Sequence, residues 1–184
     1  MVCFAFMFVS FDIINADCII FNTGLTAGDH YTHKGGGSNF LCLPYDPEYL
    51  QVQPGEQGWA VIHSAEYETG GFPPLSNVND GDIPCAVCRV SRRGTMLMIP
   101  AKIQCPSDWT EEYQGYLMTA HYNHENSKEY VCVDEDAEVR PDSNAASQDP
   151  ALLYPVEGRC SGTGNLPCRP YITGDELACV VCTI

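Results

Sequence analysis

The sequence predicts an all-β, disulfide-rich fold made of two tandem β repeats in a pseudo-twofold relation, with little or no helix. Eleven cysteines in 184 residues indicate a scaffold held by disulfides. Sixteen glycines and thirteen prolines separate short runs rich in Val, Ile, Tyr and Thr, a pattern typical of strands and turns. No segment keeps a helical period over three turns.

The repeat is visible when two segments of the chain are aligned. Gly24–Glu48 falls on Gly115–Glu138, and His30 then falls on His121, 91 residues later. Each copy continues with an aromatic–aliphatic–Cys–aliphatic run and an acidic step, and each ends in a CxxC pair. Self-similarity at a fixed shift is the mark of a repeated structural unit.

These patterns predict the boundaries of the units. We expect a first β repeat over 18–104 and a second over 105–184, the two forming one compact domain. Residues 1–17 are apolar, end near Ala16 and resemble a secretory signal peptide, a buried N-terminal strand being the alternative. No stretch is long enough to span a bilayer as a helix.

Strands are expected wherever β-branched and aromatic residues cluster between turn residues. The expected strands are Ser38–Leu43, Ala60–Tyr67, Cys85–Ser91, Thr95–Ile99, Tyr113–Tyr122, Glu129–Val133, Leu152–Glu157 and Leu177–Thr183. Long loops are expected over 70–82 and 140–150.

Charge and cysteine content restrict the class of protein. A net charge of −15 argues against a nucleic-acid partner, which would require clustered Lys and Arg. The same charge suits a cation ligand such as calcium, or simply a soluble secreted protein. So many cysteines are typical of an oxidising compartment, and we therefore expect a secreted, extracellular protein.

The two CxxC pairs favour disulfides over zinc or redox chemistry. Aliphatic residues fill and flank both pairs, which is typical of strands, and residues three apart on a strand face opposite sides. Each cysteine of a pair should therefore find a different partner. One arrangement is Cys18–Cys88, Cys42–Cys85, Cys105–Cys182 and Cys132–Cys179, with Cys160–Cys168 closing a short loop. The alternative pairing within each repeat stays open.

A cluster of acids is the sharpest local signal for a ligand. Asp134, Glu135 and Asp136 directly follow an expected strand. Calcium takes several hard oxygen ligands, and consecutive acids in a loop can supply some of them. Amide and carboxylate side chains within 123–126 would complete the shell. A solvated acidic turn is the alternative interpretation.

The block just upstream supplies candidate ligand-binding residues: His121, Tyr122, Asn123 and His124. In an extended segment the two histidines would face opposite sides, a poor arrangement for a metal clamp unless the backbone turns at Asn123. The ring of Tyr122 or of Trp109 would stack on the apolar face of a sugar. Since the His-Tyr-x-His pattern occurs in both repeats and the acid triplet in one, the histidines are expected to serve the fold and the carboxylates the function.

Several motifs together resemble a known family. They are DHYTHKGG at 29–36, NFLCLP at 39–44, AEY at 65–67, VCRV at 87–90, LMIPA at 97–101, GYLM at 115–118, HYNH at 121–124, YVCVDED at 130–136 and VEGRC at 156–160. Over about 18–184 the chain resembles the secreted invertebrate domain family labelled "short-chain collagen C4-like". It is also similar to the calcium-dependent, galactose-binding lectin of sea anemones.

The resemblance implies a disulfide-rich β fold, and the anemone lectin implies a homodimer in which calcium bridges the protein and galactose hydroxyls. This chain has no Gly-X-Y run, so the collagen label does not describe it. Its first repeat opens more briefly, with six residues from Cys18 to Gly24 against ten from Cys105 to Gly115.

The sequence therefore predicts a non-catalytic, calcium-dependent lectin for terminal-galactose glycans. The alternative is a structural module of the extracellular matrix that only mediates assembly. Enzyme motifs such as G-x-S-x-G, H-E-x-x-H and a glycine-rich phosphate loop are absent. A hydrolase with paired carboxylates stays open, although nothing singles out its acid and base.

Overall fold

The computed structural model is all-β, as the sequence predicts, and describes residues 5–7, 18–143, 148 and 150–184. Apart from 5–7, the expected signal peptide lies outside the described residues. The described strands are β1 Ala5–Met7, β2 Cys18–Gly28, β3 Leu41–Pro44, β4 His63–Tyr67, β5 Pro84–Val90, β6 Met96–Pro100, β7 Thr110–Thr119, β8 Val131–Asp134, β9 Ala151–Pro155 and β10 Ala178–Thr183. One turn of 3-10 helix covers Pro73–Leu75.

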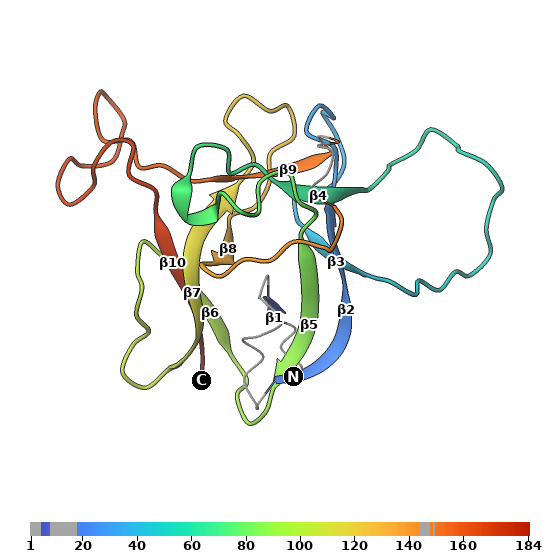
Figure 1. The fold of residues 1–184 in the computed structure, drawn as a ribbon, viewed down its shortest axis with the longest axis horizontal. Helices are drawn as coiled ribbons and strands as arrows, with labels where there is room; N and C mark the ends of the chain where they lie inside the picture. The colour runs from blue at the N-terminus through green and yellow to red at the C-terminus, as the bar shows by residue number, and fades with distance from the viewer. Residues whose placement is uncertain (1–4, 8–17, 144–147, 149) are drawn as a thin grey trace.

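The strands form one sheet whose order reads β1-β5-β2-β4-β9-β7-β10-β6, with β3 added to β2 and β8 added to β7. The order places the same pairings on either side of its middle: β2 pairs with β3, β4 and β5, and β7 pairs with β8, β9 and β10. The two groups of strands stand side by side and meet at the parallel pair β4–β9 (Figure 1). A rotation relating the two halves stays a prediction.

Strand β6 shows where along the chain the second half begins. It falls within the expected first repeat, but it pairs antiparallel with β10 of the second half. In the same way, β1 pairs antiparallel with β5. By strand pairing, the first half therefore extends through β5, and the second begins with β6.

Strand β2 is the main element that the sequence analysis did not predict. Its Asn-Thr-Gly stretch suggests a turn, but the glycine is needed inside the strand. A Cβ at Gly24 would collide with the carbonyl oxygen of Leu43 on β3, and a Cβ at Gly115 of β7 would collide with that of Val133 on β8. Each glycine therefore marks a close approach of two strands rather than a turn.

The disulfides follow the first of the two arrangements that the sequence left open. Cys42 pairs with Cys85, Cys105 with Cys182, Cys132 with Cys179 and Cys160 with Cys168. Cys88 is also disulfide-bonded; its expected partner, Cys18, has a side chain outside the described part. The disulfides are compatible with an extracellular protein.

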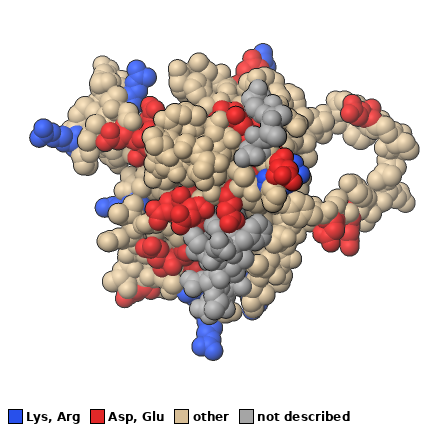
Figure 2. Space-filling model, viewed as in Figure 1, with Lys and Arg blue, Asp and Glu red and all other residues tan. Residues whose placement is uncertain are grey.

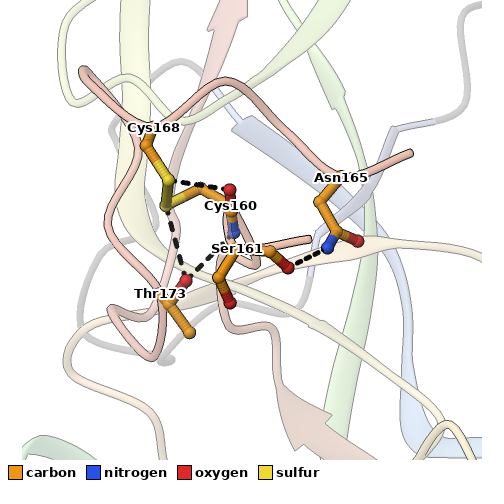
Figure 3. The surroundings of a disulfide bond; sticks show 5 residues. All are labelled: Cys160, Ser161, Asn165, Cys168 and Thr173. Carbon is orange, nitrogen blue, oxygen red and sulfur yellow. Dashed lines mark hydrogen bonds between the residues drawn. A yellow bond between two sulfur atoms is a disulfide. The ribbon is translucent and has the colours of Figure 1, made fainter. Parts of the chain in front are cut away.

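The Cys160–Cys168 disulfide closes an exposed loop between β9 and β10 that the first half lacks. The hydroxyl of Thr173 contacts Cys160 Sγ at 3.4 Å and accepts a hydrogen bond from the Cys160 amide at 3.1 Å (Figure 3). Asn165 donates a hydrogen bond to the Ser161 carbonyl within the same loop. All of these contacts join residues of the loop to one another.

The main core lies where the two halves meet. It is built from twelve buried residues of both: Phe40, Ala65, Tyr67, Leu75, Val78, Ile83, Met118, Val131, Val133, Ala137, Ala151 and Leu153. A smaller core surrounds the Cys132–Cys179 disulfide and includes Tyr113, Leu117 and Val181. Within the described residues, no helix is both long and apolar enough to cross a membrane.

The disulfides should differ in their contribution to stability. Replacing Cys132 and Cys179 with alanine should lower the free energy of unfolding by about 4 kcal/mol, since a long loop is released and a core contact is lost. Replacing Cys160 and Cys168 should cost about 2.5 kcal/mol or less, because their loop is short and exposed. Urea unfolding of both double variants measures the difference; equal losses would contradict it.

Candidate functional site

The predicted acidic triplet forms a turn at the end of β8, but its three carboxylates do not lie in the same environment. Asp134 is 1% exposed, and its Oδ1 accepts a hydrogen bond from the Asp136 amide at 3.0 Å. Glu135 and Asp136 are exposed, and Glu135 accepts a hydrogen bond from Gln114 at 2.9 Å. Asp134 thus shapes the turn that presents the other two to solvent.

The surroundings of this turn are negative. Burial, together with the charges of Asp134 and Glu138, raises the pKa of Tyr67. Burial and the charges of Glu135 and Glu176 likewise raise the pKa of Tyr116. Figure 2 shows acidic side chains across the middle of one face, with Lys and Arg mostly near its outline. Such a surface favours a cation over an anion.

The fit of this turn to calcium is partial. Within the described ranges, no group of three or more His, Cys, Asp and Glu side chains is placed to hold a metal ion. Glu135 and Asp136 are accessible and form no ion pair with a described residue. Two carboxylates could serve calcium when backbone carbonyls, waters or ligand hydroxyls complete the shell.

His121 and His124 do not lie in an extended segment, because the backbone turns at Asn123, the alternative that the sequence left open. Strand β7 ends at Thr119, and the His124 amide donates a hydrogen bond to the His121 carbonyl at 3.0 Å. The Asn123 amide also reaches His121 Nδ1, at 3.2 Å. This turn brings the two rings to a centroid distance of 5.4 Å, so they share one side.

All five histidines of the chain gather in one cluster of rings. His30, His33 and His63 lie at centroid distances of 5.2 to 5.7 Å from one another. His121 and His124 group in the same way around Tyr154, at 5.1 and 5.4 Å. Tyr31 contacts His124 at 4.6 Å and joins the two groups. The histidine blocks therefore contact each other across the two halves, and their assignment to the fold stays a prediction.

A polar network supports this cluster. Asp29 is 6% exposed and accepts hydrogen bonds from the His30 amide at 2.9 Å and from Asn126 at 3.3 Å. Its Oδ1 also lies 2.7 Å from His33 Nδ1. Burial alone would raise the pKa of Asp29, but the bonds from His33 and His30 and the charges of His33 and Lys128 lower it. Lys128 also donates to Asn126.

The structure separates the predicted metal residues from the predicted ligand-binding block. Met118 pairs with Val131 beside the histidine turn, whereas Gly115 pairs with Asp134 at the acidic turn. The two pairs are three residue steps apart along the strand, or about 10 Å. Asn126 binds Asp29 and the Gly35 carbonyl, so it does not complete a shell around the acids.

The two aromatic residues considered for sugar stacking differ in accessibility. Tyr122 is 89% exposed at the tip of the histidine turn. Trp109 is half-buried, and its amide donates to the Pro106 carbonyl at 3.0 Å. Of the two, Tyr122 offers the freer ring.

Comparison of the chain with protein-family models, with curated proteins and with solved structures found no match.

Sequence reasoning missed the contribution of His63, Asp29, Asn126 and Lys128. A signal for His63 was present, because the shift of 91 that aligns the histidine blocks also places His63 on Tyr154. The first half thus has a third histidine where the second has a tyrosine. No comparable signal pointed to Asn126 and Lys128, which reach Asp29 only through the folded loops.

The packing of Gly36 against Asp29 can be tested by substitution. Gly36 has a φ of 91°, and a Cβ there would collide with the Asp29 carboxylate. Gly36→Ala should therefore cost about 2 kcal/mol of stability, whereas Gly35→Ala, whose Cβ meets no atom within 4 Å, should cost little. In an Asp29→Ala background the Gly36→Ala cost should fall. Full additivity in urea unfolding would contradict the contact.

The histidine turn should make stability depend on pH. Burial, with the charges of His121 and Lys128, lowers the pKa of His124, so folding disfavours the protonated ring. The free energy of unfolding should therefore fall as the pH drops from about 7 to 5, and His124→Asn should reduce that slope. Urea unfolding at several pH values measures it, with Tyr122→Phe as the matched control. An unchanged slope in His124→Asn would refute this assignment.

Proposed function

We propose that the protein is a secreted, non-catalytic lectin that binds terminal-galactose glycans with the help of calcium. The supporting observation is the turn after β8, which presents Glu135 and Asp136 to solvent without an ion-pair partner among the described residues. In this proposal the two carboxylates hold calcium, and sugar hydroxyls complete its shell.

Rigidity and charge support this use of the turn. Strand β8 carries Cys132, whose disulfide to Cys179 anchors the strand in the core. The Asp134 carboxylate fixes the start of the turn through the Asp136 amide. With only two accessible carboxylates, calcium should bind weakly, with a dissociation constant of about 10⁻⁴ to 10⁻³ M, the range of extracellular modules.

A second candidate function is an assembly module of the extracellular matrix. The loop between β3 and β4, residues 45–62, projects from the body of the fold (Figure 1). Its exposed large apolar side chains are Tyr45, Tyr49, Leu50, Val52, Trp59, Val61 and Ile62. A concentration of apolar surface of this kind is typical of a protein contact, and a homodimer is the simplest form.

A glycan array probed with and without EDTA separates the two functions. The lectin proposal expects binding to galactose-terminated glycans in calcium and its loss on chelation. Absence of binding to every glycan on the array, with self-association that persists in EDTA, would favour the assembly module instead.

Substitution of the turn tests its residues directly. Glu135→Ala with Asp136→Ala should abolish calcium affinity and reduce galactoside binding at least tenfold, while the urea midpoint stays near that of the native protein. The control is Asp46→Ala with Glu48→Ala, which removes the same charge from the exposed 45–62 loop. Isothermal titration with calcium measures both variants, and unchanged affinity in the first would exclude the turn as the metal site.

A further inference from the structure

A hollow of about 600 Å³ lies away from the acidic turn, on the histidine side of the fold. Three segments line it: 29–36 of the first histidine loop, 59–61 of the projecting loop, and Glu125 from the second half. Its volume is in the range of sites for small molecules. No use for it follows from the proposed calcium site.

Trp59 provides an apolar wall for this hollow. Its side chain is 77% exposed, although a Trp ring gains more than most side chains from burial. Ala60 and Val61 continue the apolar wall. A flat, accessible indole beside polar groups suits a ligand with one apolar face and several hydroxyls.

The other lining residues carry hydrogen-bonding groups of both kinds. Thr32 offers a hydroxyl, and His33 an imidazole that is 41% exposed. Lys34 Nζ lies 3.8 Å from Glu125 Oε1, and the exposed side-chain fractions are 84% and 50%. A pair this open is easily separated, so each partner can bind a ligand hydroxyl instead.

The lining residues Asp29, Gly35 and Gly36 are held in place. Asp29 accepts hydrogen bonds from the first histidine loop and from Asn126. The Gly36 backbone packs so closely against the Asp29 carboxylate that a Cβ at this position would collide with it. Asn126 also donates to the Gly35 carbonyl at 2.8 Å, which ties the loop to the second half. The polar wall is therefore organised before a ligand arrives.

We propose that this hollow binds one pyranose ring of a neutral glycan, without calcium, by stacking on Trp59 and hydrogen bonding to Lys34 and Glu125. Lys34 pairs with Glu125, and Asp29 already accepts hydrogen bonds from the His30 amide and Asn126, so the lining carboxylates have partners and a neutral ligand is favoured over an ionic one. The ligand class rests on the proposed carbohydrate-binding function, but the site is separate from the turn after β8.

The chain's two tryptophans allow a direct test. In Trp109→Phe, Trp59 is the sole indole, and its fluorescence and quenching by acrylamide report on the hollow. The probes are the methyl glycosides of galactose, glucose, mannose and N-acetylglucosamine, titrated in EDTA. We expect at least one to protect Trp59 from acrylamide in a saturable manner. No saturable change with any of the four would overturn the proposal.

Variants of the wall identify the contacts. Trp59→Ala should weaken binding of the active glycoside about tenfold, as measured by isothermal titration, since truncating an aromatic anchor has effects of this size. Lys34→Ala should weaken it less. The matched control, Tyr49→Ala, removes an exposed ring from the same loop outside the hollow and should bind normally. Equal affinity in Trp59→Ala and Tyr49→Ala would also overturn the proposal.

The same titrations separate this site from the proposed calcium site. Suppose that Glu135→Ala with Asp136→Ala leaves binding in EDTA intact while Trp59→Ala removes it. The hollow is then supported as a sugar site, whether or not the turn binds calcium. If binding needs calcium and ignores Trp59, the hollow is excluded and the turn is favoured. Should Trp59→Ala instead change only the sedimentation of the protein, Trp59 belongs to a contact between copies, and the proposal fails.

Discussion

The parallel pairing of β4 with β9 is the constraint on which the rest of the structure depends. Ala65 lies opposite Ala151, and Tyr67 opposite Leu153, all of them buried. Two antiparallel groups of strands, each closed by its own disulfides, are thereby joined into one sheet over one core. The small side chains of Ala65 and Ala151 let large neighbours such as Met118 fill the space between the halves.

This junction also positions the loops. One histidine loop follows β2 and the other follows β7, and Tyr31 of the first loop contacts His124 of the second. The Asp29 network then spans the halves through Asn126. The acidic turn leaves β8 at its opposite end. One fold thus offers two separate surfaces, one negative and one lined by aromatic and polar groups.

Differences between the halves indicate where function lies better than their similarities do. The second half has the acidic turn, where the first has Asp46 alone. The first half has a third histidine, His63, in place of Tyr154, and a projecting apolar loop over 45–62. Features shared by both halves, such as the histidine turns, contact one another and support the fold.

The local pattern of the chain predicted most of the fold. Alternating aliphatic residues and the CxxC spacing indicated the strands, and the opposite faces of Cys179 and Cys182 indicated separate disulfide partners. Long-range geometry was not predictable in the same way. Gly24 suggests a turn until the approach of Leu43 is known, and the burial of Asp134 depends on its pairing with Gly115. The Asp29 network forms between residues 97 apart, which no local pattern reveals.

Titration of ¹⁵N-labelled protein with methyl β-galactoside, in calcium and then in EDTA, tests the central claim most directly. The proposed calcium-dependent lectin predicts amide shifts at Glu135 and Asp136 that appear with calcium, grow with the sugar and vanish on chelation. Amides of these two residues that stay unchanged in calcium and sugar, while the protein remains folded, would contradict it.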